Sequence, residues 1–364
     1  MNKLMLSAAA VALTLAASPA IAADDSGVKL NLGGYFKGYV NYTNEDDVHS
    51  LDILRDTEVH FGGETTLDNG LTVGAHIEAD ADGADGFTTD ETYLYFAGSW
   101  GRANFGVEDG AAYLLQVAAP SADDNIDGIR QTINPYAMGS VDYANDQTRG
   151  ADKLTYLSPV FSGFQAGASY TPQAADITAL GAVASRGALG NSTDNDLGEY
   201  DGAWELAARY EGMVSNVGVI FGAGYTHASN ETDGAVSVDV DGDGINDLGP
   251  FALDDFSEWN VGLDLDIGAF GVGAAYTESN LGVDANEDWE TIVLGADYTT
   301  GPFKIGASFM NSEIDTVLEL DRYTAGVVYT YGPGMSFRGS LGYQDEDVSD
   351  VDATVVSVGT QINF

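Results

Sequence analysis

The last ten residues, VVSVGTQINF (355–364), carry the pattern that decides the fold. Read in steps of two, one row is mostly apolar and ends on Phe364, whereas the alternating row is polar or small. Successive side chains of a β-strand point to opposite faces, so this segment predicts a strand with one apolar and one wet face. Such a strand suits either a half-buried soluble sheet or a sheet with lipid on one side and water on the other.

Short alternating blocks of the same kind recur along the whole chain. The 364 residues include 46 Gly and 19 Tyr but only 8 Pro, and this usage with repeated alternation favours an all-β protein. We predict sixteen strands, near residues 28–43, 51–66, 70–80, 90–99, 101–108, 151–159, 163–172, 199–212, 215–229, 256–267, 269–279, 287–299, 301–312, 319–331, 334–345 and 352–364.

The connections between these blocks alternate between very short and long. Short ones such as LDNG (67–70), GAFG (268–271) and YGPG (331–334) carry turn residues, and most of the others are acidic loops. This regularity is typical of a transmembrane β-barrel, and sixteen antiparallel strands enclose an aqueous channel rather than a filled core. Aromatic residues near strand ends are expected at the level of the lipid headgroups: Tyr42, Trp100, Trp204, Tyr210, Tyr225, Trp259, Trp289, Tyr298 and Tyr331.

The first segment, MNKLMLSAAAVALTLAASPAIA (1–22), has one early lysine, an apolar stretch and small residues before the acidic residues begin. It predicts a secretory signal peptide, because the apolar run is too short for a spanning helix. Residues 23–364 then form a single barrel domain. The chain has no cysteine, so no disulfide framework holds it together.

The charge balance is strongly acidic, with 57 Asp and Glu against 13 Lys and Arg and a net charge of −44. Nucleic acid is excluded as an expected partner because duplex binding depends on basic side chains that neutralise phosphates. Cations are the expected small partners. The alternative is that most of these acids only keep the protein soluble.

Several stretches resemble one known family. They are NLGGYFKGYVNY (31–42), TTLDNGLTVGAHIE (65–78), YLYFAGSWGRANFGVEDG (93–110), RGADKLTYLSPVFSGFQAGASY (149–170) and the closing INF (362–364). The chain resembles the general diffusion porins of Gram-negative bacteria, in particular the sixteen-stranded trimeric porins of alphaproteobacteria. The resemblance implies a homotrimer in the outer membrane, in contact with lipid and lipopolysaccharide, that passes small hydrophilic solutes and performs no enzymatic step.

In this family the long third loop folds into the barrel and narrows it, and the matching segment here is 109–150. The resemblance implies an acidic side of the constriction formed by Glu108, Asp109, Asp123, Asp124 and Asp127, with Asp142 and Asp146 as further candidates. Strand parity puts a facing pore wall on Lys29, Lys37, Glu58, His60, His76, Glu78 and Arg102, with Arg55 and Arg130 as further basic candidates.

Carboxylates at Glu58, Glu64, Glu78 and Asp80 stand on the lumen row where many relatives have arginines. Because rings of carboxylates favour cations, we expect a cation-preferring channel. For each acid of the loop, the alternative is an ordinary solvated charge.

The segment DVDGDGINDLG (239–249) predicts a calcium site. Asp239, Asp241, Asp243 and Asp247 occupy positions 1, 3, 5 and 9 of a calcium loop, with the Ile245 carbonyl at position 7. Position 12, where a bidentate Glu normally stands, is Pro250. The alternative is an acidic hairpin tip. Calcium is the only cofactor that the sequence suggests, and none is required for a channel.

No constellation of catalytic residues is visible in the sequence. The four histidines, His49, His60, His76 and His227, show no metal-ligand spacing, and no phosphate-binding loop follows a strand. The chain is therefore predicted not to be an enzyme. The alternatives are a substrate-specific outer-membrane channel, a calcium-dependent secreted adhesin and a barrel enzyme.

Overall fold

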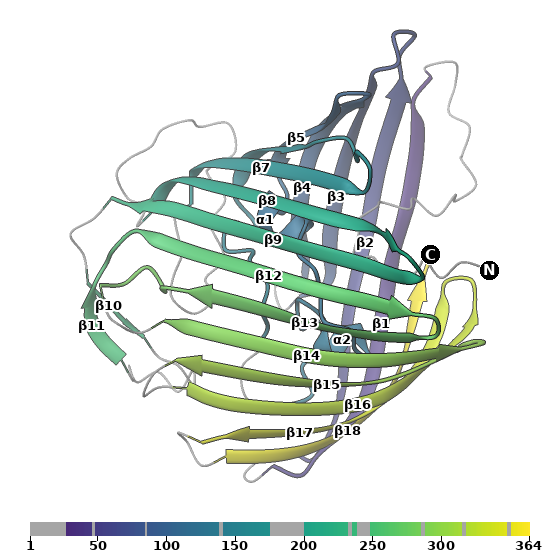
Figure 1. The fold of residues 1–364 in the computed structure, drawn as a ribbon, viewed down its shortest axis with the longest axis vertical. Helices are drawn as coiled ribbons and strands as arrows, with labels where there is room; N and C mark the ends of the chain where they lie inside the picture. The colour runs from purple at the N-terminus through teal and green to yellow at the C-terminus, as the bar shows by residue number, and fades with distance from the viewer. Residues whose placement is uncertain are drawn as a thin grey trace.

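Sixteen strands close into one antiparallel barrel (Figure 1), so the predicted fold class is confirmed. The computed structural model describes residues 27–45, 48–83, 86–137, 141–174, 200–231, 235–238, 248–284, 288–314, 318–347 and 351–364. The barrel strands are β1 (Lys29–Thr43), β2 (Leu51–Thr66), β3 (Thr72–Gly83), β4 (Gly86–Gly98), β5 (Gly101–Val107), β6 (Asp152–Leu157), β7 (Phe164–Gln173), β8 (Tyr200–Val214), β9 (Val217–Asn230), β12 (Phe256–Ile267), β13 (Phe270–Ser279), β14 (Trp289–Thr300), β15 (Phe303–Ile314), β16 (Leu318–Gly332), β17 (Met335–Glu346) and β18 (Val351–Asn363).

A separate two-stranded sheet and two short helices complete the described elements. The sheet pairs β10 (Ala235–Val238) with β11 (Leu248–Ala252), and the helices are α1 (Ala111–Leu114) and α2 (Asp124–Asp127). None of these four was predicted, because each spans only four or five residues. The predicted signal peptide (1–22) and the predicted calcium ligands Asp239, Asp241, Asp243, Ile245 and Asp247 lie outside the described residues.

The barrel closes where the last strand pairs with the first. Phe36 lies opposite Ile362, and the backbone N–H groups of Gly34 and Phe364 each donate to the carbonyl of the other at 3.0 Å. Gly34 has a φ of 153°, and a Cβ there would collide with the Glu58 carbonyl and the Phe364 ring. Only glycine suits this close approach. The terminal phenylalanine thus completes the ladder and keeps its ring on the outside.

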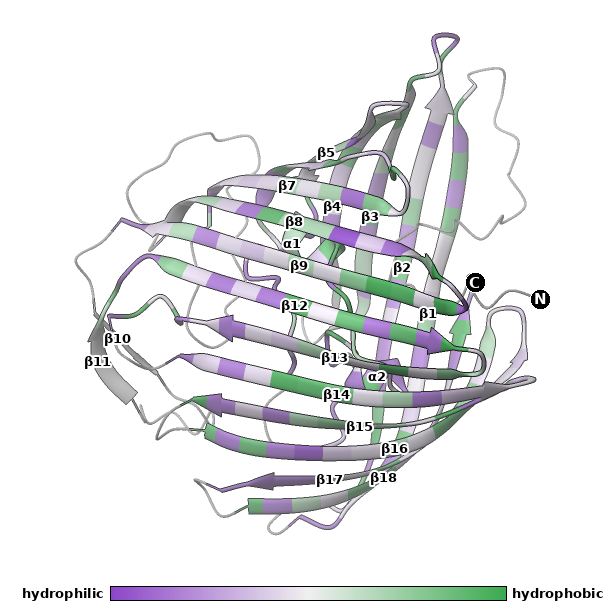
Figure 2. Cartoon of the chain, in the orientation of Figure 1, coloured by the Kyte–Doolittle hydropathy of each residue, from purple (hydrophilic) through white to green (hydrophobic). Residues whose placement is uncertain are grey.

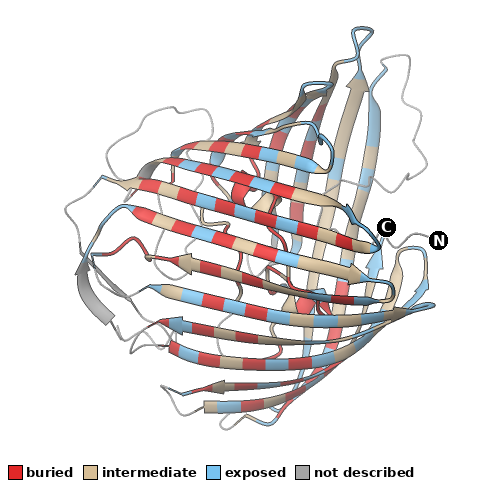
Figure 3. Cartoon of the chain, in the orientation of Figure 1, coloured by how far each residue is buried: buried red, intermediate tan, exposed pale blue. Residues whose placement is uncertain are grey.

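Each strand separates an outer apolar row from an inner row, as its alternation predicts. Val356, Val358 and Ile362 of β18 are exposed, whereas Ser357 between them is fully buried. Figure 3 shows this two-residue alternation of burial around the barrel, and Figure 2 shows hydrophobic and hydrophilic positions interleaved along the same strands. An apolar outer surface with exposed aromatic rings is the surface of a barrel that crosses a membrane.

One of the aromatic residues predicted for the outer surface lies inside. Trp289 packs against a buried apolar cluster within the barrel, and its indole N–H donates to the Ser312 hydroxyl at 2.7 Å. The prediction failed because Trp289 is the first residue of β14, and a position near a strand end does not show whether the side chain points outward or inward. Among the described residues, no helix is long and apolar enough to cross a membrane.

The segment between β5 and β6 is here called loop L3 (108–151). Its described residues, 108–137 and 141–151, run through the barrel interior and contain α1 and α2. Loop residues Ala119, Ile129 and Tyr143 pack on wall residues such as Val293 and Leu320 in one buried apolar cluster. Part of the inner row is therefore apolar, contrary to the expectation of a uniformly polar lumen. The loop covers these positions, so they need not face water.

Candidate functional site

Loop L3 approaches the wall closely along a row of glycines, because side chains are missing where the loop backbone passes. The closest approaches involve Gly295, where a Cβ would run into the Pro120 carbonyl, and Gly262, where it would meet the Val117 Cβ at 2.9 Å. This glycine row continues over successive strands and comprises Gly222, Gly262, Gly273, Gly295, Gly306 and Gly326. At each of these positions except Gly326, a Cβ would come within 3 Å of a loop atom and push the loop toward the lumen.

Buried polar groups of the wall satisfy the backbone of the loop. The Glu205 carboxylate of β8 accepts a hydrogen bond from the Ala112 N–H at 2.9 Å and another from the Thr148 hydroxyl. The Arg322 guanidinium of β16 donates to the Val141 carbonyl at 3.1 Å. Since buried backbone groups require partners, these side chains fix both halves of the loop.

One guanidinium clamps helix α2 of the loop. Arg338 of β17 donates to one oxygen each of Asp123 and Asp124 at 2.6 Å. Asp123 also accepts from the Tyr39 hydroxyl at 2.9 Å and caps α2 through the Asn125 N–H. Asp123 is only 1% exposed, whereas Asp124 is 71% exposed on the lumen side of the pair. Asp123 therefore anchors the loop, and Asp124 is the acid that meets water.

A second guanidinium joins the two ends of the loop. Arg130 donates to both oxygens of Asp109 and, through Nε, to Asp146 at 2.5 Å. Its guanidinium carbon lies 3.7 Å from the centre of the Tyr113 ring, which adds a cation–π contact. Arg130 is thus a loop residue paired with loop acids and does not belong to the facing wall for which it was a candidate.

Burial raises the pKa values of several acids of the loop. It raises the pKa of Glu108 to about 8, although the Arg102 guanidinium opposes the rise. Burial, and after it the charge of Asp146, raises the pKa of Asp142 to about 6, and burial raises the pKa of Asp127 to about 6. These carboxyls therefore change charge between slightly acidic and slightly basic pH.

The part of β2–β4 around Glu58, His60 and Glu78, whose side chains are 18–28% exposed, is here called the uncovered wall, with Lys37 of β1 at its edge. Farther along β2, Leu54 packs against the loop. The Lys37 ammonium pairs with Asp56 at 2.6 Å and reaches Thr132 of the loop at 3.1 Å. Arg102 of β5 donates to Asn104 at 2.6 Å and lies over the Tyr95 ring. Both cations are therefore engaged by neighbours.

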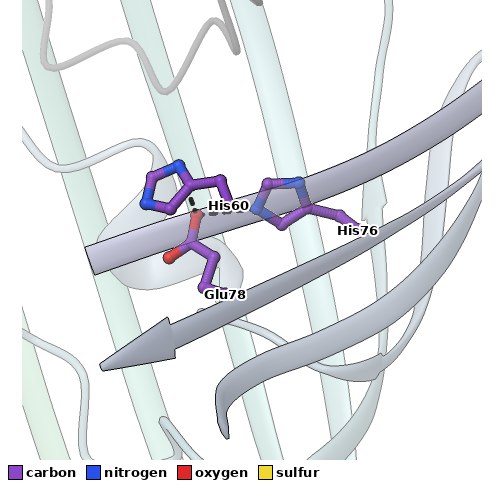
Figure 4. A group of neighbouring side chains, drawn as sticks. All are labelled: His60, His76 and Glu78. Atoms are coloured by element: carbon purple, nitrogen blue, oxygen red, sulfur yellow. Dashed lines mark hydrogen bonds and ion pairs between the residues drawn. The ribbon is translucent and has the colours of Figure 1, made fainter. Parts of the chain in front are cut away.

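The same uncovered wall carries two histidines with two glutamates. His60 Nε2 lies 3.0 Å from a Glu58 oxygen, and His76 Nε2 lies 2.7 Å from Glu78 Oε1 (Figure 4). The register of β2 and β3 puts His60 opposite Glu78, and this brings the two imidazoles to 5.7 Å between ring centres. The spacing of the histidines in the sequence therefore did not show that His60 and His76 lie close together.

One of the basic candidates has another position. Arg55 is exposed in the row of β2 that alternates with the inner residues Asp56 and Glu58. Lys29 keeps the strand parity of Lys37 and lies opposite Glu64, but it is exposed at the start of β1.

Lys153 of β6 also donates to the loop carbonyls of Glu108 and Thr148. Sequence reasoning missed the anchoring roles of these wall residues, namely Tyr39, Lys153, Glu205, Arg322 and Arg338. Their polar character on an inner row was visible in the alternation, but their loop partners were not.

Together, these features define a class of protein. A closed membrane-spanning barrel whose interior holds a charged, wall-anchored loop is a channel-forming outer-membrane barrel. A sequence profile described as Gram-negative porin matches residues 8–349, and the chain belongs to this family. The protein is accordingly an outer-membrane diffusion channel of a bacterium, and both family and fold point to a channel rather than an enzyme. A search of curated protein sequences finds no match.

Solved structures share the fold at low sequence identity. The anion-selective porin from Comamonas acidovorans has a TM-score of 0.61 and 16% identity over 93% of this chain and 100% of that one. OmpT of Vibrio cholerae in its in-vitro folded trimer form has a TM-score of 0.63 and 14% identity over 93% and 100%. A mutant of the Rh. blastica porin has a TM-score of 0.58 and 16% identity over 92% and 100%.

Proposed function

We propose that the channel is a homotrimeric general porin that passes small hydrophilic solutes and ions by passive diffusion and prefers cations. The observation that carries the preference is the charge balance at the Arg338 clamp. Arg338 faces two carboxylates, Asp123 and Asp124. At the other clamp, the two carboxylates of Asp109 and Asp146 face two guanidiniums, because Arg149 lies 3.7 Å from Asp146 in addition to Arg130. The Arg338 cluster thus keeps an excess negative charge inside the barrel.

The remaining charges of loop L3 and of the uncovered wall support the same sign. Between residues 109 and 150 the sequence has six aspartates and two arginines, which leaves an excess of four negative charges. On the wall, Glu58 and Glu78 add two further carboxylates, each in contact with a histidine. A low-dielectric wall strengthens such a field, and a negative field concentrates cations in the lumen.

The sign of selectivity is a property of side chains and not of the fold. The Comamonas acidovorans porin has a similar barrel and is anion-selective. Cation preference in the present chain therefore depends on the carboxylates named above and is open to direct reversal by substitution.

The proposed trimer rests on the likeness to OmpT of Vibrio cholerae, which was solved in a trimer form. The exposed apolar row of the barrel is suited to contact with lipid and lipopolysaccharide, which we propose as its surroundings. Calcium binding by residues 239–249 stays a prediction from the sequence. It requires no change in the diffusion mechanism.

Reversal potentials in planar bilayers with asymmetric KCl test the preference. We expect the wild-type channel to favour potassium and Asp124→Asn to weaken that preference, because Asp124 is the exposed acid of its clamp. Asp68→Asn is the matched control, since Asp68 lies in the exposed turn between β2 and β3. Chloride preference in the wild type would refute the charge argument, and absence of conductance would refute the channel.

A further inference from the structure

The uncovered wall contains a donor set that the diffusion function does not use. His60, His76 and Glu78 lie on neighbouring strands and share the inner face of the barrel. Figure 4 shows the two imidazoles and the Glu78 carboxylate meeting beside the β2–β3 ladder. We propose that these three residues bind a divalent transition-metal cation of the zinc class, with Glu58 as a positioning residue.

The distances suit one small cation. The Glu78 Oε1 atom lies 2.7 Å from His76 Nε2 and 3.6 Å from His60 Nδ1, and all three donor atoms lie within 4.8 Å of one another. A tetrahedral zinc ion with bonds of about 2.0–2.1 Å holds its ligand atoms roughly 3.3 Å apart. Side-chain shifts of about an ångström therefore convert this cluster into a coordination shell.

A carboxylate orients the more exposed imidazole. His60 Nε2 lies 3.0 Å from Glu58 Oε2, which leaves Nδ1 on the side of Glu78. Metal-binding histidines characteristically give their second ring nitrogen to such a carboxylate, which fixes the tautomer and strengthens the ligand. Glu58 supplies this outer contact before any metal arrives.

The buried imidazole of His76 makes no polar contact among the described residues besides the one with Glu78. His76 is 2% exposed, its Nε2 contacts Glu78, and its Nδ1 has no hydrogen-bond partner among the described residues. The nitrogen that faces the proposed site is therefore Nε2, through its contact with Glu78. The rings are held in place by Tyr35, at 5.9 Å from His60, and Tyr93, at 5.3 Å from His76.

The site is open to ions in the lumen. The side chains of His60 and Glu78 are 28% and 18% exposed, so water can occupy a fourth coordination position. Two imidazoles and one carboxylate form a donor set that suits Zn²⁺, whereas Mg²⁺ and Ca²⁺ prefer oxygen ligands alone. The expected ligand is thus distinct from the calcium predicted for residues 239–249.

Binding is tested on the folded full-length protein in detergent by titration calorimetry with ZnCl₂. Excess calcium is present throughout to occupy oxygen-only sites on this acidic protein. We expect one zinc ion per chain in the wild type and loss of that site in His60→Gln and His76→Gln. Glu58→Gln should weaken binding by about tenfold, the lower end of what outer-shell partners contribute. His227→Gln is the control, because its β9 row alternates with the buried Thr226 and Ala228.

A spectroscopic measurement keeps the proposal testable independently of conductance. Cobalt(II) bound by the wild type should give visible absorption bands of a four-coordinate site, and Glu78→Gln should remove them while heat-modifiable mobility confirms a folded barrel. Equal zinc binding by the wild type and the His60→Gln/His76→Gln double variant would overturn the proposal. So would loss of binding in His227→Gln, and neither result depends on whether the protein conducts.

Discussion

The interior of the barrel has two unlike regions: the arc covered by loop L3, and the uncovered wall of β2–β4. On the covered arc, glycines and buried carboxylates such as Glu205 accommodate and hold the loop. On the uncovered wall, Gly74 lies under the Tyr95 ring of the same wall, and Glu58 pairs with His60, which water can reach. The same residue types therefore anchor backbone in one region and set charge and binding in the other.

The largest expected effect is on the covered arc, at the Arg338 clamp. Arg338→Ala leaves the Asp123 carboxylate buried without its cation, which should lower the free energy of unfolding by roughly 3–5 kcal/mol. Denaturant unfolding of the folded barrel in lipid or detergent measures this change. Asp123→Asn in the same chain should recover part of the loss, as a double-mutant cycle would show. Equal stability of wild type and Arg338→Ala would mean that the pair does not hold the loop.

The next effect concerns the glycine row. Gly295→Ala adds a Cβ in the path of the Pro120 carbonyl, so the loop must shift toward the lumen at a cost of roughly 1–3 kcal/mol, and single-channel conductance should fall. Gly332→Ala is the matched control, because a Cβ there would meet nothing within 4 Å. If both variants conduct like the wild type, the close approach does not determine the pore size.

Removing one tyrosine hydroxyl in each region allows the two regions to be compared directly. The Tyr39 hydroxyl donates to Asp123 and accepts from Asn125, both at 2.9 Å, whereas the Tyr95 hydroxyl donates to Glu64 at 2.7 Å. Tyr39→Phe should cost about 1.5–3 kcal/mol and change conductance, because it frees α2 from the wall. Tyr95→Phe should cost less, because it removes one hydrogen bond instead of two, and should leave conductance unchanged. Similar conductance changes in both would remove the distinction between the regions.

The smallest effect is a pH dependence of selectivity. The raised pKa values mean that Asp127 and Asp142 lose charge below about pH 6 and Glu108 gains charge only above about pH 8. Negative charge in the lumen therefore increases with pH, and the preference for potassium should increase across both ranges. Reversal potentials measured from pH 5 to pH 9 record it, and Glu108→Gln should abolish the upper step alone. A preference that decreases with pH would contradict this assignment.

Much of the fold could be predicted from the sequence. The alternation in segments such as 355–364 gave the sixteen strands and their inner and outer rows, and the turn residues separated short from long connections. Errors occurred where local pattern is ambiguous, as at Trp289 on the first residue of its strand. The four-residue helices and the β10–β11 strand pair are too short to produce a periodic signal.

The candidate site was predictable only in part. Parity put Lys37, His60, His76 and Glu78 on the inner row, but sequence spacing could not show which of them meet. Arg338 and Asp123 are 215 residues apart and form one ion pair. The fold of loop L3, which has no periodic pattern, determines such contacts.

The sequence by itself determined the faces of the strands, because side-chain direction in an extended chain repeats every two residues and needs no distant partner. Only the tertiary structure decided that His60 lies opposite Glu78 beside His76, and that Arg338 holds loop L3. Those contacts depend on the register between strands and on the path of the loop through the closed barrel. Both are fixed by interactions between segments far apart in the chain, which no local pattern records.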